Sequence, residues 1–127
     1  MEDGAKIYRD MMDNIVEMSR NCVAAEWARK IDAKGIEDAP KLNALFSKLT
    51  DEERELLARF ATDAYMDGMY DLLCDIEWHV DCRDMKVTVE GVALPVTKYE
   101  GIGNDFIGRR DGWKWPEERQ GDDKDVR

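Results

Sequence analysis

Residues 50–82 read TDEERELLARFATDAYMDGMYDLLCDIEWHVDC, and this stretch decides the fold. Thr50 followed by Glu53 fits a capping box, in which each side chain accepts a hydrogen bond from the backbone N–H of the other residue. The acidic residues 51–53 complement the positive end of the helix dipole. The sequence therefore predicts a long helix that begins after Thr50 and continues through about residue 80.

Residues four apart in this helix separate into apolar and polar rows. One apolar row is expected to form the core: Leu56, Phe60, Ala64, Gly68, Leu72, Ile76 and Val80. Gly68 is expected to allow a second backbone to approach closely, which would compensate for its cost in helix propensity of about 0.8–1 kcal/mol. A third row is polar throughout and includes Asp63, Asp67, Asp71 and Asp75.

Negative charge is concentrated in the same segment. From Asp51 to Asp84 there are 11 Asp and Glu residues against 3 Arg, a net charge of −8 in a chain whose total is −10. Like charges spaced i,i+4 on a helix repel by a few tenths of a kcal/mol per pair. Four successive aspartates therefore indicate a solvated face or a surface that meets a basic partner.

A magnesium site is an alternative interpretation of the aspartates. All-helical nucleotide pyrophosphohydrolases hold Mg²⁺ with carboxylates from neighbouring helices, and magnesium prefers such oxygen ligands. The paired i,i+3 acidic motifs of that enzyme class are not present in both helices, and no cluster of Lys or Arg lies near the row to bind a phosphate. The carboxylates available for this alternative are Asp63, Asp67 and Asp71 together with Asp10, Asp13 and Glu17.

Amphipathic periodicity predicts another helix from Gly4 to Ile31, which Lys34-Gly35 and Pro40 would end. Apolar residues between positions 42 and 49 indicate a short helical segment before the long helix. Because the apolar rows of a 3.6-residue helix drift around its axis, the two long helices are expected to pack obliquely.

After Cys82 the apolar period becomes two. A turn at Glu90-Gly91 would pair Val89 with Val92, and it would pair residue 87 with residue 94, which places apolar side chains on one face. The turn is expected to be type I′, or type I with a glycine bulge, because Glu is a poor first residue for type I′.

The C-terminal part is expected to be irregular, with at most one helical turn near Asp105–Arg109. Gly101-x-Gly103 lacks the preceding strand and the following long helix of a nucleotide-binding loop. Trp113 and Trp115 would point the same way, either as an exposed pair for a partner or as cover for the core. Residues 117–127 are predicted to form a disordered charged tail.

The sequence also predicts neighbours for the basic residues of the C-terminal third and for His79. Lys98, Arg109, Arg110 and Lys114 are expected to lie against the aspartates of the long helix and to offset their repulsion. His79, the only histidine, follows Asp75 by one turn. We interpret it as a helix-terminal histidine bonded to a carboxylate, with a general base as the alternative.

Composition limits the classes of partner. The chain of 127 residues has 29 Asp and Glu against 19 Lys and Arg, which disfavours nucleic acid and anionic membranes. No apolar run approaches the length of a membrane span, and the first residues lack a signal-peptide pattern. The odd number of cysteines, with no metal-binding spacing, indicates reduced thiols. We therefore expect a cytoplasmic location.

The segment from Val87 to Glu117 contains V-x-V-x-G-V-x-L-P, D-F-I-G-R and W-P-E. In the order and spacing of these residues, about the last two thirds of the chain resembles small bacterial or phage-borne proteins of an uncharacterised family. The resemblance implies no activity.

These patterns predict a mainly α (α+β) fold, in which a β-hairpin and an irregular C-terminal segment lie on two long, obliquely packed helices. Residues 1–116 are expected to form a single domain. The predicted function is a non-enzymatic protein-binding or regulatory module, such as an inhibitor or immunity protein, with no cofactor and no metal ligand assigned. The alternative is a Mg²⁺-dependent phosphohydrolase, and apolar residues on both helices also allow a homodimer. The predicted partner-binding residues are Asp63, Asp67, Asp71, Asp75, Trp113 and Trp115.

Overall fold

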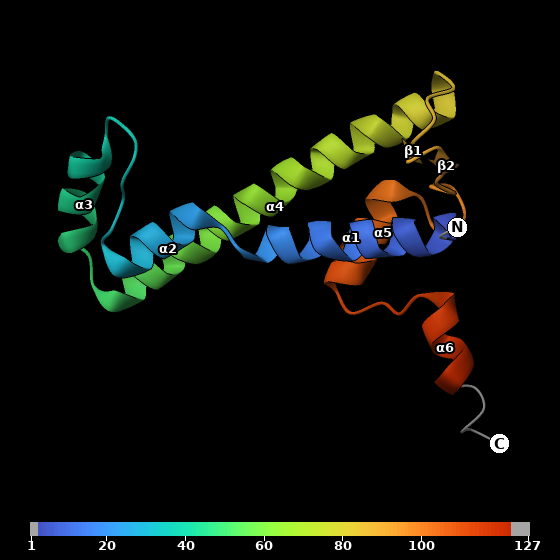
Figure 1. The fold of residues 1–127 in the computed structure, drawn as a ribbon. Coiled ribbons are helices and arrows are strands. Elements are labelled where there is room, and N and C mark those ends of the chain that lie inside the picture. The colour runs from blue at the N-terminus through green and yellow to red at the C-terminus, as the bar shows by residue number, and fades with distance from the viewer. Residues whose placement is uncertain (1–2, 123–127) are drawn as a thin grey trace. The chain divides into compact units, whose positions relative to one another are not determined.

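The computed structural model describes residues 3–122 and is mainly helical (Figure 1). Its elements are α1 (Gly4–Arg20), α2 (Val23–Lys30), α3 (Ala39–Ser47), α4 (Asp51–Cys82), β1 (Thr88–Val89), β2 (Val92–Ala93), α5 (Ile102–Arg110) and α6 (Pro116–Asp122). The prediction of a mainly α protein with one β-hairpin is therefore confirmed. Residues 117–122, which the sequence predicts to be part of a disordered tail, lie in α6, and the rest of that predicted tail is outside the described residues.

The start of α4 is the capping box that the sequence predicts. The backbone N–H of Glu53 donates to Thr50 Oγ1 over 3.1 Å, and the backbone N–H of Thr50 donates to Glu53 Oε1 over 2.9 Å. The hydrogen bond that its carboxylate accepts from the backbone N–H of Thr50 lowers the pKa of Glu53. The predicted long helix is therefore confirmed as one continuous element of 32 residues.

The helix predicted from Gly4 to Ile31 is instead two helices. The break falls at Cys22, whose backbone is extended with φ −78° and ψ 114°. Just before it, the side-chain amide of Asn21 donates to the carbonyl of Glu17 over 3.0 Å. Asn side chains that bond to the backbone in this way compete with helical hydrogen bonds. This competition is a physical reason for the break, which the apolar periodicity alone did not reveal.

The chain divides into two compact units, and α1 and α4 contribute residues to both. Unit 1 contains residues 1–16 and 70–127, and unit 2 is the continuous segment 17–69. In unit 2, Phe46 packs in a core of small side chains, which come from α2, α3, α4 and the segments on either side of α2: Cys22, Ala25, Ala28, Ala33, Ala39 and Ala58. Small residues at a contact let helix axes come close together.

The predicted core row of α4 was wrong at three of its large side chains, of which Leu72 is 61% exposed in unit 1 and the other two lie in unit 2. Leu56 is 62% exposed and Phe60 is 69% exposed, whereas Ala58 between them is fully buried. Residues two apart lie about 200° apart around a helix, so burying Ala58 turns both large side chains outward. The prediction of close backbone approach at Gly68 also failed, because a Cβ built there meets no described atom within 4 Å.

In unit 1, the hairpin has the predicted register. Val89 pairs with Val92, and the N–H of Leu94 donates to the carbonyl of Val87 over 2.9 Å. Glu90 and Gly91 have φ of 49° and 80°, the signs required by a type I′ turn. The segment expected to be irregular contains α5 instead, which supplies the buried residues Ile102 and Phe106.

Candidate functional site

The four aspartates of α4 are all exposed, as the polar row predicts. Among the ion pairs of residues 3–122, none includes Asp63, Asp67 or Asp71. Asp75 lies 3.6 Å from Nδ1 of His79, and this ring nitrogen is 2.8 Å from the carbonyl oxygen of Asp75. The contact matches a helix-terminal histidine beside a carboxylate.

The exposed face of α4 in unit 2 carries apolar side chains as well as carboxylates. We define the acidic–apolar face as Leu56, Phe60, Asp63, Ala64 and Asp67, all of which are exposed. At 100° per residue, these five positions fall within one side of the helix, opposite buried Ala58. The large exposed side chains and the unpaired charges therefore occupy the same surface.

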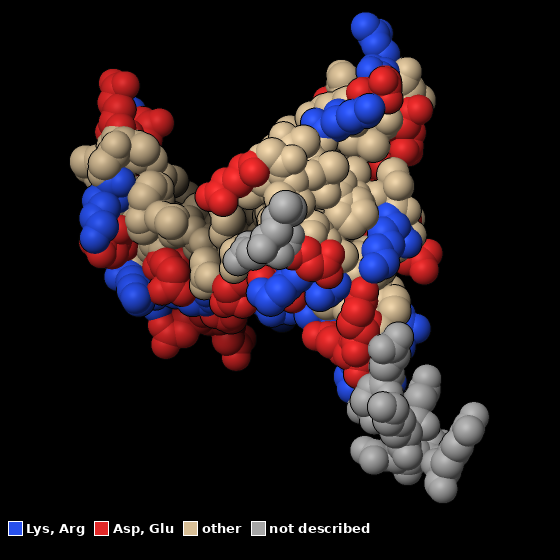
Figure 2. Space-filling view, turned by 45° about the vertical axis from the view of Figure 1, so that its right-hand side comes forward, with Lys and Arg blue, Asp and Glu red and all other residues tan. Residues whose placement is uncertain are grey.

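Arg109 and Lys98, which are predicted to lie against these aspartates, pair with other acids. The guanidinium of Arg109 binds Asp13 with two hydrogen bonds of 2.7 and 3.1 Å and pairs with Glu118 at 2.9 Å. Lys98 pairs with Glu117 at 3.4 Å. Figure 2 shows acidic and basic side chains interspersed on the face it presents. Arg109 and Lys98 therefore pair with acids outside the aspartate row.

Trp115 is core rather than an exposed partner-binding residue. It is 2% exposed, and its ring centroid is 4.7 Å from Tyr99 and 5.2 Å from Trp113. Its indole N–H donates to Asp13 over 3.4 Å. Trp113 is half-buried, with the guanidinium of Arg119 5.1 Å from its ring centroid. Of the two tryptophans, only Trp113 presents part of its surface to solvent.

A buried carboxylate that the sequence analysis missed lies in unit 1. Asp105 has no exposed surface, and it accepts hydrogen bonds from Tyr8 Oη over 2.5 Å and from the backbone N–H of Glu100 over 3.0 Å. Burial raises the pKa of Asp105, while the bond from Tyr8 opposes that rise. Burial and then the neighbouring Asp105 raise the pKa of Tyr8, so this phenol stays protonated as a donor.

The glycines of Gly101-x-Gly103 make room for side chains of α4. A Cβ at Gly101 would overlap the carboxylate of Glu77, and a Cβ at Gly103 would come within 2.8 Å of Cys74 Sγ. The backbone N–H of Gly103 donates to Glu77 Oε1 over 3.2 Å. Glu77 thus supplies an anion to the N-terminal end of α5, where a nucleotide-binding loop would hold phosphate.

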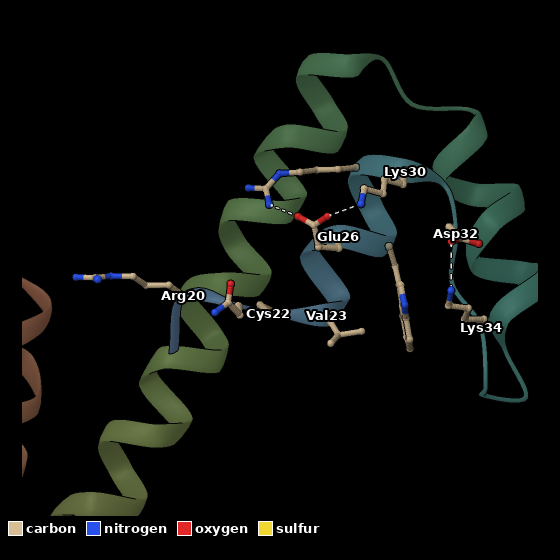
Figure 3. A pocket seen from close by; sticks show the side chains of 10 residues that line it. Arg20, Cys22, Val23, Glu26, Lys30, Asp32 and Lys34 are labelled. Carbon is tan, nitrogen blue, oxygen red and sulfur yellow. Dashed lines mark hydrogen bonds and ion pairs between the residues drawn. The ribbon is translucent and has the colours of Figure 1, made fainter. Parts of the chain in front are cut away.

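The cavity in Figure 3 lies in unit 2 and has a volume of about 360 Å³. Its charged residues largely pair with one another: Glu26 contacts Lys30 at 3.0 Å, and Asp32 contacts Lys34 at 3.6 Å. Arg29 in the same wall makes two bonds to Glu55, of 2.9 and 3.2 Å. Figure 3 shows Arg20 extending away from these pairs. The cavity therefore offers little uncompensated charge to an ionic ligand.

The three carboxylates that the first helix would contribute to a magnesium site are paired with basic side chains. Asp10 pairs with Lys6 at 2.7 Å, and Glu17 pairs with Arg20 at 3.6 Å, while Asp13 is held by Arg109. No group of three or more His, Cys, Asp or Glu side chains in residues 3–122 is arranged to hold a metal ion. The cysteines are unpaired thiols, and only Cys82 is exposed.

The fold and these contacts define a small acidic, mainly helical protein with an exposed acidic–apolar helix face and a buried Tyr–Asp pair. The chain belongs to a family of unknown function (DUF6547), whose family model matches residues 1–117. The predicted resemblance to an uncharacterised family is thereby confirmed. Neither the curated proteins nor the solved structures gave a match. Within residues 3–122, no helix is long and apolar enough to cross a membrane.

Proposed function

We propose that this protein is a non-enzymatic binding module whose acidic–apolar face takes a basic partner protein. The observation that carries the proposal is the coincidence of unpaired carboxylates with large exposed apolar side chains on one side of α4. An inhibitor-like or immunity-like role, in which a small acidic protein covers a basic surface, fits this arrangement.

The two kinds of side chain would contribute differently to binding. Burying a Leu or Phe side chain contributes about 1.5–3 kcal/mol, so Leu56 and Phe60 would supply affinity. Asp63 and Asp67 would accelerate association with a positive surface and exclude acidic partners. A partner that inserts an apolar side chain between basic residues would complement both features.

Charge favours a different protein over a second copy of this chain as the partner. When two identical helices pair antiparallel about a two-fold axis, the row of residues beside the contact on one helix faces the same row on the other helix. Asp63 and Asp67 of one copy would then approach the same residues of the other, and like charges in an interface are unfavourable. The homodimer that the sequence allows would therefore need a different surface.

The experiment is capture of partner proteins from the source cells at low and high salt, followed by titration of the captured protein after its purification. The test variants are Asp63→Lys with Asp67→Lys, and Phe60→Ser. The matched controls are Glu37→Lys with Asp38→Lys, and Ile36→Ser, which change exposed residues elsewhere in unit 2. We expect a basic protein that binds the wild type and both controls, loses affinity for both test variants, and is released by salt.

Two results would overturn the proposal. One is a captured protein whose affinity does not change in either test variant. The other is the absence of any protein whose retention distinguishes the test variants from their controls.

A further inference from the structure

A second cavity, in unit 1, is lined only by apolar surface. It has a volume of about 220 Å³. Side chains from α1, α4, α5 and the segment before β1 line it. Among them are Met11, Ile15, Ile76, Met85 and Val87. No residue of the acidic–apolar face takes part in its wall.

The chemistry of this wall selects an apolar occupant. A buried water needs two to four polar partners, whereas an apolar cavity of about 150 Å³ stays dry and binds benzene. The cavity here is larger, which suits an alkyl chain or aromatic group of roughly eight to ten non-hydrogen atoms. Met11 and Met85 are unbranched and polarizable, so they can adapt to the shape of such a group.

The charge beside the cavity selects the head group of the occupant. A neighbouring cavity of about 240 Å³ shares Val96 and Ile102 with the apolar one, and Glu77, Asp81 and Glu100 line it. Within residues 3–122, no ion pair includes any of these three acids. Glu77 does accept one backbone hydrogen bond, from Gly103 over 3.2 Å. A cationic group therefore meets uncompensated negative charge beside Val96 and Ile102.

We propose that unit 1 binds a small amphiphilic amine, with its apolar body in the 220 Å³ cavity and its ammonium group toward Asp81 and Glu100. This site is independent of the proposed protein-binding face, which lies in unit 2. A fatty acid of the same length would bring a carboxylate to the acidic side. A neutral alcohol would fill the same volume but gain no attraction from the two acids.

The experiment compares three probes of equal chain length: octylammonium, octanoate and 1-octanol. Their binding is followed by NMR of the protein labelled at its methionine methyl groups, and by calorimetry. We expect octylammonium to bind saturably with shifts at Met11 and Met85, whereas Met18, which is 54% exposed in unit 2, stays unchanged. Octanoate should bind at least about tenfold more weakly, since charge complementarity discriminates between them.

Two kinds of variant locate the probe. Ile76→Trp fills the cavity and should abolish binding, and Val87→Phe serves the same purpose if the tryptophan variant does not fold. Asp81→Asn with Glu100→Gln should reduce the preference for octylammonium over 1-octanol. The control Asp75→Asn removes an exposed carboxylate of α4 outside both cavity walls and should retain the preference.

Three results would overturn the proposal: no saturable shift with octylammonium, equal affinity for octanoate, or binding that survives a folded cavity-filling variant. If a second copy of the chain covers the cavity instead, octylammonium will not bind and Ile76→Trp will change the sedimentation coefficient.

Discussion

Tyr8 and Asp105 are separated by 97 residues in sequence and joined by one short hydrogen bond. Tyr8 lies in the amphipathic segment that predicts the first helix, and its side chain is completely buried. It gave no reason to place a carboxylate beside the phenol, because residues 101–108 have no helical periodicity. The pair depends on the contact between α1 and α5 in unit 1, which no local pattern encodes.

The raised pKa of Asp105 predicts a specific effect of pH on stability. Because the folded state holds this proton more tightly than the unfolded state, the associated stability is complete below the ordinary pKa of 3.8 and is lost as pH rises to the folded pKa. We therefore expect the unfolding free energy of the wild type, minus that of Asp105→Asn, to fall as pH rises from about 4. Urea unfolding from pH 3.5 to pH 8 provides the measurement.

Asp111→Asn is the control, because Asp111 is an exposed acid at the end of the same helix. Its difference from the wild type should not show that fall. A constant difference for Asp105→Asn, or one that increases with pH, would contradict the role assigned to burial.

At the scale of the elements, two local signals predicted the structure correctly, whereas the break at Cys22 and the contacts between segments were not predicted. The capping box at Thr50 and the hairpin at Glu90-Gly91 are local, and both are present. The N-terminus of α5 depends instead on Glu77, which lies 26 residues before Gly103. At the end of α2, the C-cap residue Ile31 adopts a left-handed backbone conformation with φ 56°, which glycine would adopt more easily.

Ile31→Gly should be more stable than Ile31→Ala by about 1 kcal/mol, because a left-handed conformation costs about 1–2 kcal/mol in a residue with a Cβ. Ile31 is only 36% exposed, so both substitutions lose a similar amount of buried apolar surface, and the comparison removes that loss. At Ile36, whose φ is not positive, Ile36→Gly should be no more stable than Ile36→Ala. Thermal and urea unfolding of the four variants test the prediction, which fails if Ile31→Gly is no more stable than Ile31→Ala.

The glycines of α4 and α5 predict opposite effects for the same substitution. Gly68→Ala should stabilise by about 0.8–1 kcal/mol, because alanine has the better helix propensity and the site is open. Gly103→Ala should destabilise, since its Cβ would lie 2.8 Å from Cys74 Sγ. Unfolding free energies of the two variants provide the comparison. A destabilised Gly68→Ala would show that a contact does form at that position.

At the scale of the whole molecule, charge is unevenly compensated. The chain carries a net charge of −10, yet Arg109 and Lys98 pair with Asp13, Glu117 and Glu118 rather than with the aspartate row. The exposure of that row could be predicted from helical spacing alone. Its missing counterions could not, because the partners of a cation depend on which helices meet.

Added NaCl should therefore stabilise the protein against urea. Repulsion along the row amounts to a few tenths of a kcal/mol per i,i+4 pair, and salt screens it between exposed charges. Asp67→Asn should show a smaller gain, because Asp67 belongs to two of the three successive pairs of the row. The control Glu37→Gln should show the wild-type gain. Equal gains in all three proteins would indicate that the row does not repel itself measurably.

The carboxylate of Glu77 occupies the space that a side chain at position 101 would require. This packing links two positions that lie far apart in the chain. The backbone of Gly101 also has a positive φ of 101°, so glycine is favoured there whatever residue stands at position 77. Members of the family are therefore expected to keep glycine at position 101 even where position 77 varies.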